Sequence, residues 1–191
     1  WMGMPDKDDE CVTKNYGWMY SLTMPRELTL RQGHIYSLPV KEMQALRRPE
    51  SKQLLQVAGE RVITRSLFNT CEVLLDLSWQ EAGQIEFSLI YAAERLFIGY
   101  DISRQVLTIN RDGLKNGGRG IRKFKLPAAK QLNIRLFIDR SAIEVFFQQG
   151  LEAASILVYP VKDTVPQLEL KADKPITVTG AIWRLNAYNY Q

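Results

Sequence analysis

Short runs of alternating apolar and polar residues follow one another from about residue 60 to the end of the chain. In "CEVLLDLSW", Val73, Leu75 and Leu77 share one face, because side chains alternate with a period of two in extended chain. "GQIEFSLIYA", "NIRLFIDR" and "ITVTGAIWRLNAY" repeat the pattern, and about ten such runs are separated by short spacers. We therefore predict an all-β fold, an antiparallel β-sandwich of two packed sheets, each with an inner apolar face and an outer polar face.

The N-terminal part of the chain has a different character. "YSLTMPRELTLRQGHIYSLPV" alternates well enough for two strands joined around Gln32-Gly33. "PVKEMQALRR" predicts one or two helical turns, and the polar "RPESKQ" is the best candidate for a boundary. We predict a first part at residues 1–40, a short helical linker at residues 41–51 and the sandwich at residues 52–191.

Composition narrows the class of protein. Hydrophobic residues make up 46% of the chain and charged residues 24%, as in ordinary globular proteins. The apolar runs are far shorter than the roughly 20 residues that span a bilayer, and no signal-like segment opens the chain. A Trp precedes the first Met, which suggests a piece of something longer. Cys11 and Cys71 match no metal spacing, and we expect reduced thiols rather than a disulfide, no cofactor, no membrane partner and a cytoplasmic protein.

The net charge of +4 is modest, but basic residues gather in "NRDGLKNGGRGIRKFK". A nucleic-acid site needs stacking aromatics among the charges, and Phe124 is the single candidate. The glycines do not lie between a strand and a helix, as a phosphate-binding loop requires. We favour a solvated hairpin whose charges protect a sheet edge. The basic residues are Arg111, Lys115, Arg119, Arg122, Lys123 and Lys125.

The segment "LFIDRSAIEVFFQQG" contains two acids that invite a catalytic interpretation. A retaining glycosidase needs two carboxylates about 5 to 5.5 Å apart. Asp139 ends one strand beside a tight turn, whereas Glu144 faces away from Ile143 and Val145 on the next. The spacing therefore favours structural roles for both acids.

"FIDRSAIEVFFQQG" resembles the "F-x-D-x-S-x-x-E-x-F" hairpin in the C-terminal sandwich of glycoside hydrolase family 32. "WMGMP", "YGWMYSLTMPRELTL" and "IYSLPVKEMQALR" look like the last blade of that family's five-bladed β-propeller and its connection to the sandwich. Ser37 departs from the Gln that is frequent there. The motifs, which cover nearly the whole chain, are most similar to those of bacterial sucrose-6-phosphate hydrolases.

The resemblance implies a parent enzyme, a retaining β-fructofuranosidase acting on sucrose-6-phosphate, sucrose or fructan through a covalent fructosyl-Asp intermediate. That family's catalytic acids lie in "N-D-P-N-G", "R-D-P" and "E-C" motifs on earlier blades. We therefore expect no catalytic residue in this chain, and Glu10-Cys11 imitates "E-C" by coincidence. The chain alone is predicted to be inactive, a structural cap on the propeller or an interface in a homo-oligomer, without a nucleic-acid partner.

The resemblance also gives one substrate-binding candidate. The Trp of "W-M-G" lies at the mouth of the propeller pocket, so Trp1 is predicted to border the fructosyl site, with packing in the blade as the alternative. We expect Trp18, Arg26 and Glu27 to fix the blade, the last two through buried or half-buried polar contacts. His34 has no partner motif for nucleophilic catalysis.

Other aromatic residues separate two hypotheses for the sandwich. Trp79 and Trp183 lie within strand patterns, so we expect them in the core or at its rim. The alternative function is a lectin-like sugar-binding module. It would require exposed aromatics such as Tyr91, Phe97 or Tyr100.

Overall fold

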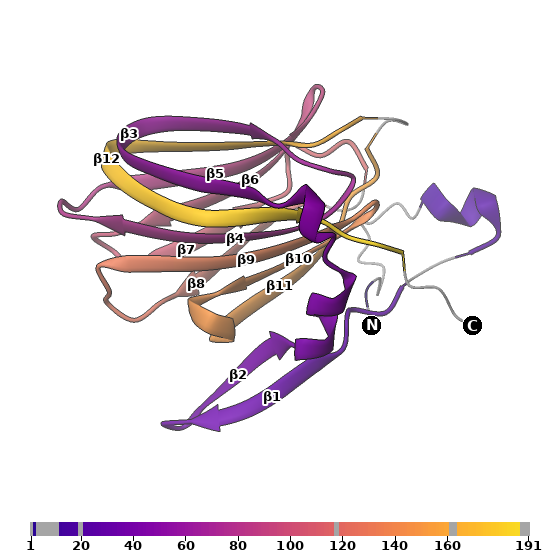
Figure 1. Cartoon of the computed structure of the whole chain (residues 1–191), viewed down its shortest axis with the longest axis horizontal. Coiled ribbons are helices and arrows are strands. Elements are labelled where there is room, and N and C mark those ends of the chain that lie inside the picture. Colours follow the sequence, from indigo (N-terminus) through magenta and orange to yellow (C-terminus); the bar gives the residue numbers. More distant parts are fainter. Residues whose placement is uncertain (1, 3–11, 19–20, 117–118, 161–163, 188–191) are drawn as a thin grey trace.

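A computed structural model describes residues 2, 12–18, 21–116, 119–160 and 164–187. Within them, a ten-stranded antiparallel sheet folds over into two packed layers, which confirms the predicted β-sandwich (Figure 1). None of the helices in the described part of the chain is long enough or apolar enough to cross a membrane. The elements are η1 (Val12–Tyr16), β1 (Arg26–Arg31), β2 (His34–Pro39), η2 (Lys41–Leu46), η3 (Pro49–Ser51), β3 (Gln53–Ser66), β4 (Thr70–Trp79), β5 (Gln84–Tyr91), β6 (Glu94–Asp101), β7 (Val106–Asn110), β8 (Ile121–Lys125), β9 (Gln131–Asp139), β10 (Ala142–Phe147), η4 (Gln148–Gly150), β11 (Glu152–Leu157) and β12 (Gln167–Arg184).

The two long strands β3 and β12 belong to both layers. The first part of β12 pairs with β5, and its second part pairs with β4, while β3 follows along its other side. One layer is therefore β3-β12-β4-β9-β10-β11 and the other is β3-β12-β5-β6-β7-β8. The alternating runs "PQLELKA" and "ITVTGAIWRLNAY" predict two separate strands in the segment that β12 occupies. The structure has one bent strand, because pairing with β3 resumes after register shifts between Lys171 and Thr177.

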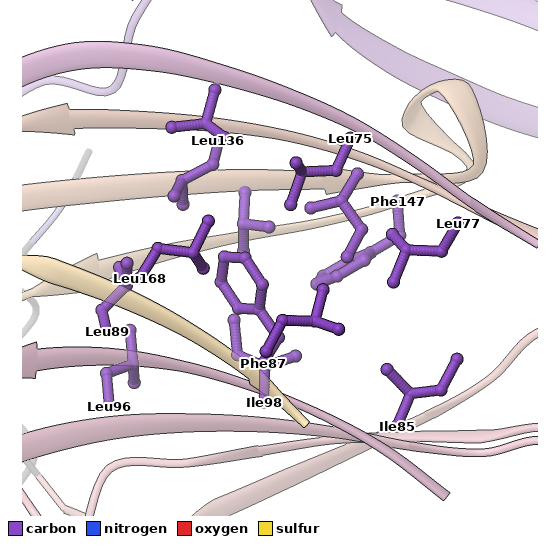
Figure 2. Close-up of a cluster of buried hydrophobic side chains, with 14 of the residues drawn as sticks. Leu75, Leu77, Ile85, Phe87, Leu89, Leu96, Ile98, Leu136, Phe147 and Leu168 are labelled. Carbon is purple, nitrogen blue, oxygen red and sulfur yellow. The ribbon is translucent and has the colours of Figure 1, made fainter. Parts of the chain in front are cut away.

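The space between the layers is filled by the residues that the period of two turns inward. Val73, Leu75 and Leu77 on β4 are fully buried, as predicted. Figure 2 shows side chains of β4, β9 and β10 packing toward those of β5, β6 and β12. The labelled residues are Leu75, Leu77, Ile85, Phe87, Leu89, Leu96, Ile98, Leu136, Phe147 and Leu168.

The segment before β3 forms a separate hairpin and two short 3₁₀ turns. β1 and β2 pair through a turn in which Gln32 and Gly33 have φ of 50° and 78°, values that suit the twist of a two-residue hairpin loop. This confirms two strands joined at that dipeptide, and η2 confirms the helical turn predicted in "PVKEMQALRR". Figure 1 shows the hairpin standing beside η2, next to the layer that contains β10 and β11.

The prediction that both outer faces are polar is wrong for the β4–β9–β10 layer. Phe137 and Phe146 point outward, as the alternation requires, but are 2% and 0% exposed. The planes of their rings lie at 89° to each other, and both rings pack beneath Met24, Leu38 and Leu46 of the N-terminal segment. Alternation identifies the side on which a residue lies. It does not show which part of the chain covers that side.

Candidate functional site

Two buried glutamates lie in one row across the outer face of the β4–β9–β10 layer. Glu72 on β4 is opposite Phe137 on β9, which is opposite Glu144 on β10, and opposed residues share a face. Glu72 is 0% exposed and Glu144 is 5% exposed. Since adjacent strands are about 4.8 Å apart, the two positions are separated by about 10 Å.

The carboxylate of Glu72 binds two arginines. Arg47 Nε donates to Oε2 at 2.7 Å, while Arg47 Nη2 and Arg135 Nε donate to Oε1, each at 2.8 Å. The Arg47 guanidinium also lies over the Trp183 ring, 4.2 Å from its centroid. Because Arg47 directly follows η2, this ion pair joins the turn to β4 and β9.

The carboxylate of Glu144 binds the start of the hairpin. The backbone N–H of Met24 donates to Oε1 at 2.6 Å, and Arg26 Nη2 donates to Oε2 at 2.5 Å. Arg26 Nη2 also contacts Ser155 Oγ at 2.7 Å, and its guanidinium lies 4.9 Å from the centroid of the Phe146 ring. The predicted polar contact of Arg26 is thereby confirmed.

These contacts bear on whether the acids could catalyse a reaction. A general acid or nucleophile needs an oxygen directed at substrate, but both oxygens of Glu72 and of Glu144 accept hydrogen bonds from the protein. Asp139 is exposed at the β9–β10 turn, where it is opposite Ala142. The structure therefore brings Glu72 and Glu144 together as anchors for the N-terminal segment.

The other residues that the sequence analysis singled out in the N-terminal segment lie largely at the surface or outside the described residues. Glu27 is exposed, so the buried or half-buried contact predicted for it is wrong. Trp18 is 47% exposed. His34 is also exposed, at the end of the hairpin turn. Trp1 and Glu10 lie outside the described residues, so the predictions about them remain untested.

The aromatic residues argue against a sugar-binding platform. Trp79 and Trp183 are 5% and 9% exposed, which confirms them as core and rim residues. Tyr91 and Tyr100, which the lectin-like alternative needs at the surface, are 3% and 2% exposed. They are buried because they share the inward phase of β5 and β6 with the core leucines and isoleucines. Of the three aromatic residues that this alternative requires, only Phe97 is half-buried.

Of two titratable groups elsewhere in the described chain, one is buried in the core and the other is paired with basic side chains. Cys71 is a free, fully buried thiol, and burial raises its pKa to about 12, so it is unreactive at neutral pH. The hydrogen bond from Lys171, with help from Arg95, lowers the pKa of Glu169 on β12. Among the described residues, no three His, Cys, Asp or Glu side chains gather as a metal site.

Fold and contacts together define an antiparallel β-sandwich domain that binds a preceding chain segment through buried ion pairs. The chain belongs to the family "Glycosyl hydrolases family 32 C terminal", whose pattern matches residues 42–184. It is 31% identical to raffinose invertase of Escherichia coli over 97% of this chain and 38% of that protein. It is 32% identical to sucrose-6-phosphate hydrolase of Zymomonas mobilis over 78% of this chain and 31% of that protein.

Solved structures agree on the fold. Sucrose-6-phosphate hydrolase from Lactobacillus gasseri superposes with a TM-score of 0.78 at 23% identity, over 97% of this chain and 38% of the other. Exo-inulinase from Aspergillus awamori gives a TM-score of 0.72 at 19% identity, over 86% and 36%. The chain thus spans less than two fifths of the length of these relatives.

Proposed function

We propose that this chain is the non-catalytic C-terminal part of a retaining β-fructofuranosidase of the sucrose-6-phosphate hydrolase type, acting on sucrose-6-phosphate or sucrose. Residues 1–40 are then the end of its propeller, residues 41–51 the linker and residues 52–191 the sandwich. The observation that carries this proposal is that the buried acids Glu72 and Glu144 bind the preceding segment. The sandwich acts as a support that holds the last propeller blade in place.

The energetics of the two ion pairs fit this role. Removing one partner of a buried ion pair costs about 3–5 kcal/mol, because the other charge is left uncompensated. The pairs Arg26–Glu144 and Arg47–Glu72 fix the N-terminal segment at two points about twenty residues apart. A hairpin that would be marginal in water alone is thereby fixed on the sandwich.

The hairpin also presents an unpaired apolar surface. Leu28, Leu30 and Ile35 are 66%, 74% and 64% exposed, and Leu30 is directly opposite Ile35. Neighbouring exposed apolar side chains of this size indicate a missing contact. We assign that contact to the earlier strands of the parent's last blade.

Hydrolysis assays test the central proposal. The 191-residue chain, given sucrose and sucrose-6-phosphate separately, should release no fructose above the buffer background. Turnover that scales with protein concentration would show that the chain holds its own catalytic residues.

Two further assignments belong to the same proposal. Trp1 borders the fructosyl site, so Trp1→Ala in the full-length parent should raise KM, and unchanged kinetics would leave only a packing role.

The protein is cytoplasmic, in keeping with the free thiol of Cys71. Cell fractionation checks the compartment, and a secreted product would contradict it.

A further inference from the structure

The free edge of β3 differs from the other edges of the sandwich. Among the described residues, β3 pairs only with β12 and is 14 residues long, whereas the edge strand β8 has five residues. β8 carries three exposed basic residues, which is a common protection of sheet edges. By contrast, residues 53–59 of β3 carry no charge, and Leu54 is 75% exposed.

Residues 53–58 of this uncharged stretch are also the regular part of the edge. From Gln53 to Val57 the register with β12 is unbroken, and Ala58 is opposite Thr177 before the bulge. Gly59, with φ of 75°, then bends the strand toward the second layer. An uncharged edge in regular register presents its outward N–H and C=O groups to any strand that can align with it.

We propose that residues 54–58 pair with the same residues of a second copy of this chain, antiparallel about a two-fold axis through Gln56. This pairing makes one layer continuous across two molecules. A symmetric contact of this kind requires a self-complementary strand, since each residue meets its counterpart across the axis.

The sequence of β3 meets that requirement. Directly opposed residues share a face, so Leu54 meets the partner's Ala58 and Gln56 meets its own copy on the outer side. On the inner side, Leu55, which is 3% exposed, meets the half-buried Val57 of the partner subunit, so the core continues across the axis. A pairing centred on Leu55 would instead place Leu54 opposite the polar side-chain amide of Gln56 in the second copy.

Substitution at the residue on the axis gives a specific test. Gln56 is exposed, so Gln56→Lys keeps the fold but places two ammonium groups opposite each other. Like charges in opposed positions should weaken the dimer by up to about fivefold. Gln167→Lys, the same change at an exposed position on β12, should leave dimerisation unchanged. Sedimentation equilibrium of the 191-residue chain measures both, with circular dichroism as the check on folding.

A mixing experiment isolates the two-fold pairing. Gln56→Lys and Gln56→Glu should each dissociate alone but form a heterodimer when mixed, because opposite charges then face each other across the axis. Three results would overturn the proposal: a wild-type chain that stays monomeric at high micromolar concentration, equal effects of the two lysine variants, or a mixture that associates no better than its components.

Discussion

Replacing Glu72 with glutamine removes one charge from the most buried ion pair and nearly preserves the shape of the side chain. The carboxylate is 0% exposed and accepts three hydrogen bonds, at 2.7, 2.8 and 2.8 Å. The side chains of Arg47 and Arg135 are only 19% and 14% exposed, so water cannot fully replace the lost charge.

The expected loss follows from these contacts. Each charge-assisted hydrogen bond contributes about 1.5–3 kcal/mol, but the amide keeps one acceptor oxygen and such terms do not add. Breaking a buried ion pair costs about 3–5 kcal/mol, so Glu72→Gln should reduce the free energy of unfolding by about 3 kcal/mol. For a chain of this size, that lowers Tm by about 6–12 °C.

Glu169→Gln is the matched control. Glu169 also has two basic partners, at 2.8 and 2.9 Å, but Arg95 and Lys171 are 41% and 43% exposed. Its loss should cost about 1 kcal/mol or less, because water screens the pair. Urea unfolding followed by tryptophan fluorescence compares the variants.

Equal losses of stability in the two variants would show that burial does not strengthen the Glu72 ion pair. A loss of less than about 1 kcal/mol in Glu72→Gln would show that this ion pair contributes no more than a surface contact.

Other predictions follow from single contacts. Cys71 is fully buried and its pKa is raised to about 12, so it should resist iodoacetamide at neutral pH in the native chain and react in urea. Peptide mass mapping shows whether Cys71 carries the label, and rapid labelling of the native chain would contradict the burial. The pKa of Glu169 is lowered from 4.5 in the folded chain by Lys171, so its contribution is present above the unfolded pKa and is lost as pH falls below it. Acid titration of stability should therefore be shallower in Glu169→Gln, and identical curves would refute this. Gly180→Ala should cost several kcal/mol, because an added Cβ would lie 2.0 Å from the Leu74 carbonyl oxygen; an unchanged urea midpoint would show that the strands separate easily.

The sandwich was predictable because each strand carries its own pattern. Val73, Leu75 and Leu77 alternate regardless of which strands lie beside them, so their burial could be read from the sequence alone. The single bent β12 was not predictable, since "ADKP" has the composition of a turn and only pairing with β3 keeps the chain extended.

The anchoring site was only partly predictable. Arg26 was expected to make a polar contact, but Glu72, Arg47 and Arg135 were not singled out. The sequence does place Glu72 and Arg135 at positions of two strands that can share the outer face. This pairing can be recognised only when the register between β4 and β9 is known and when η2 is known to pack over that face, and the sequence gives neither.

β12 is the last strand of the sandwich along the chain, and it pairs with β3, the first, and with β4 and β5. During synthesis, neither layer can therefore close until almost all of this chain has left the ribosome. Until then β4 and β5 each expose an edge that β12 covers in the folded chain, and unpaired strand edges of this kind favour aggregation of the nascent polypeptide.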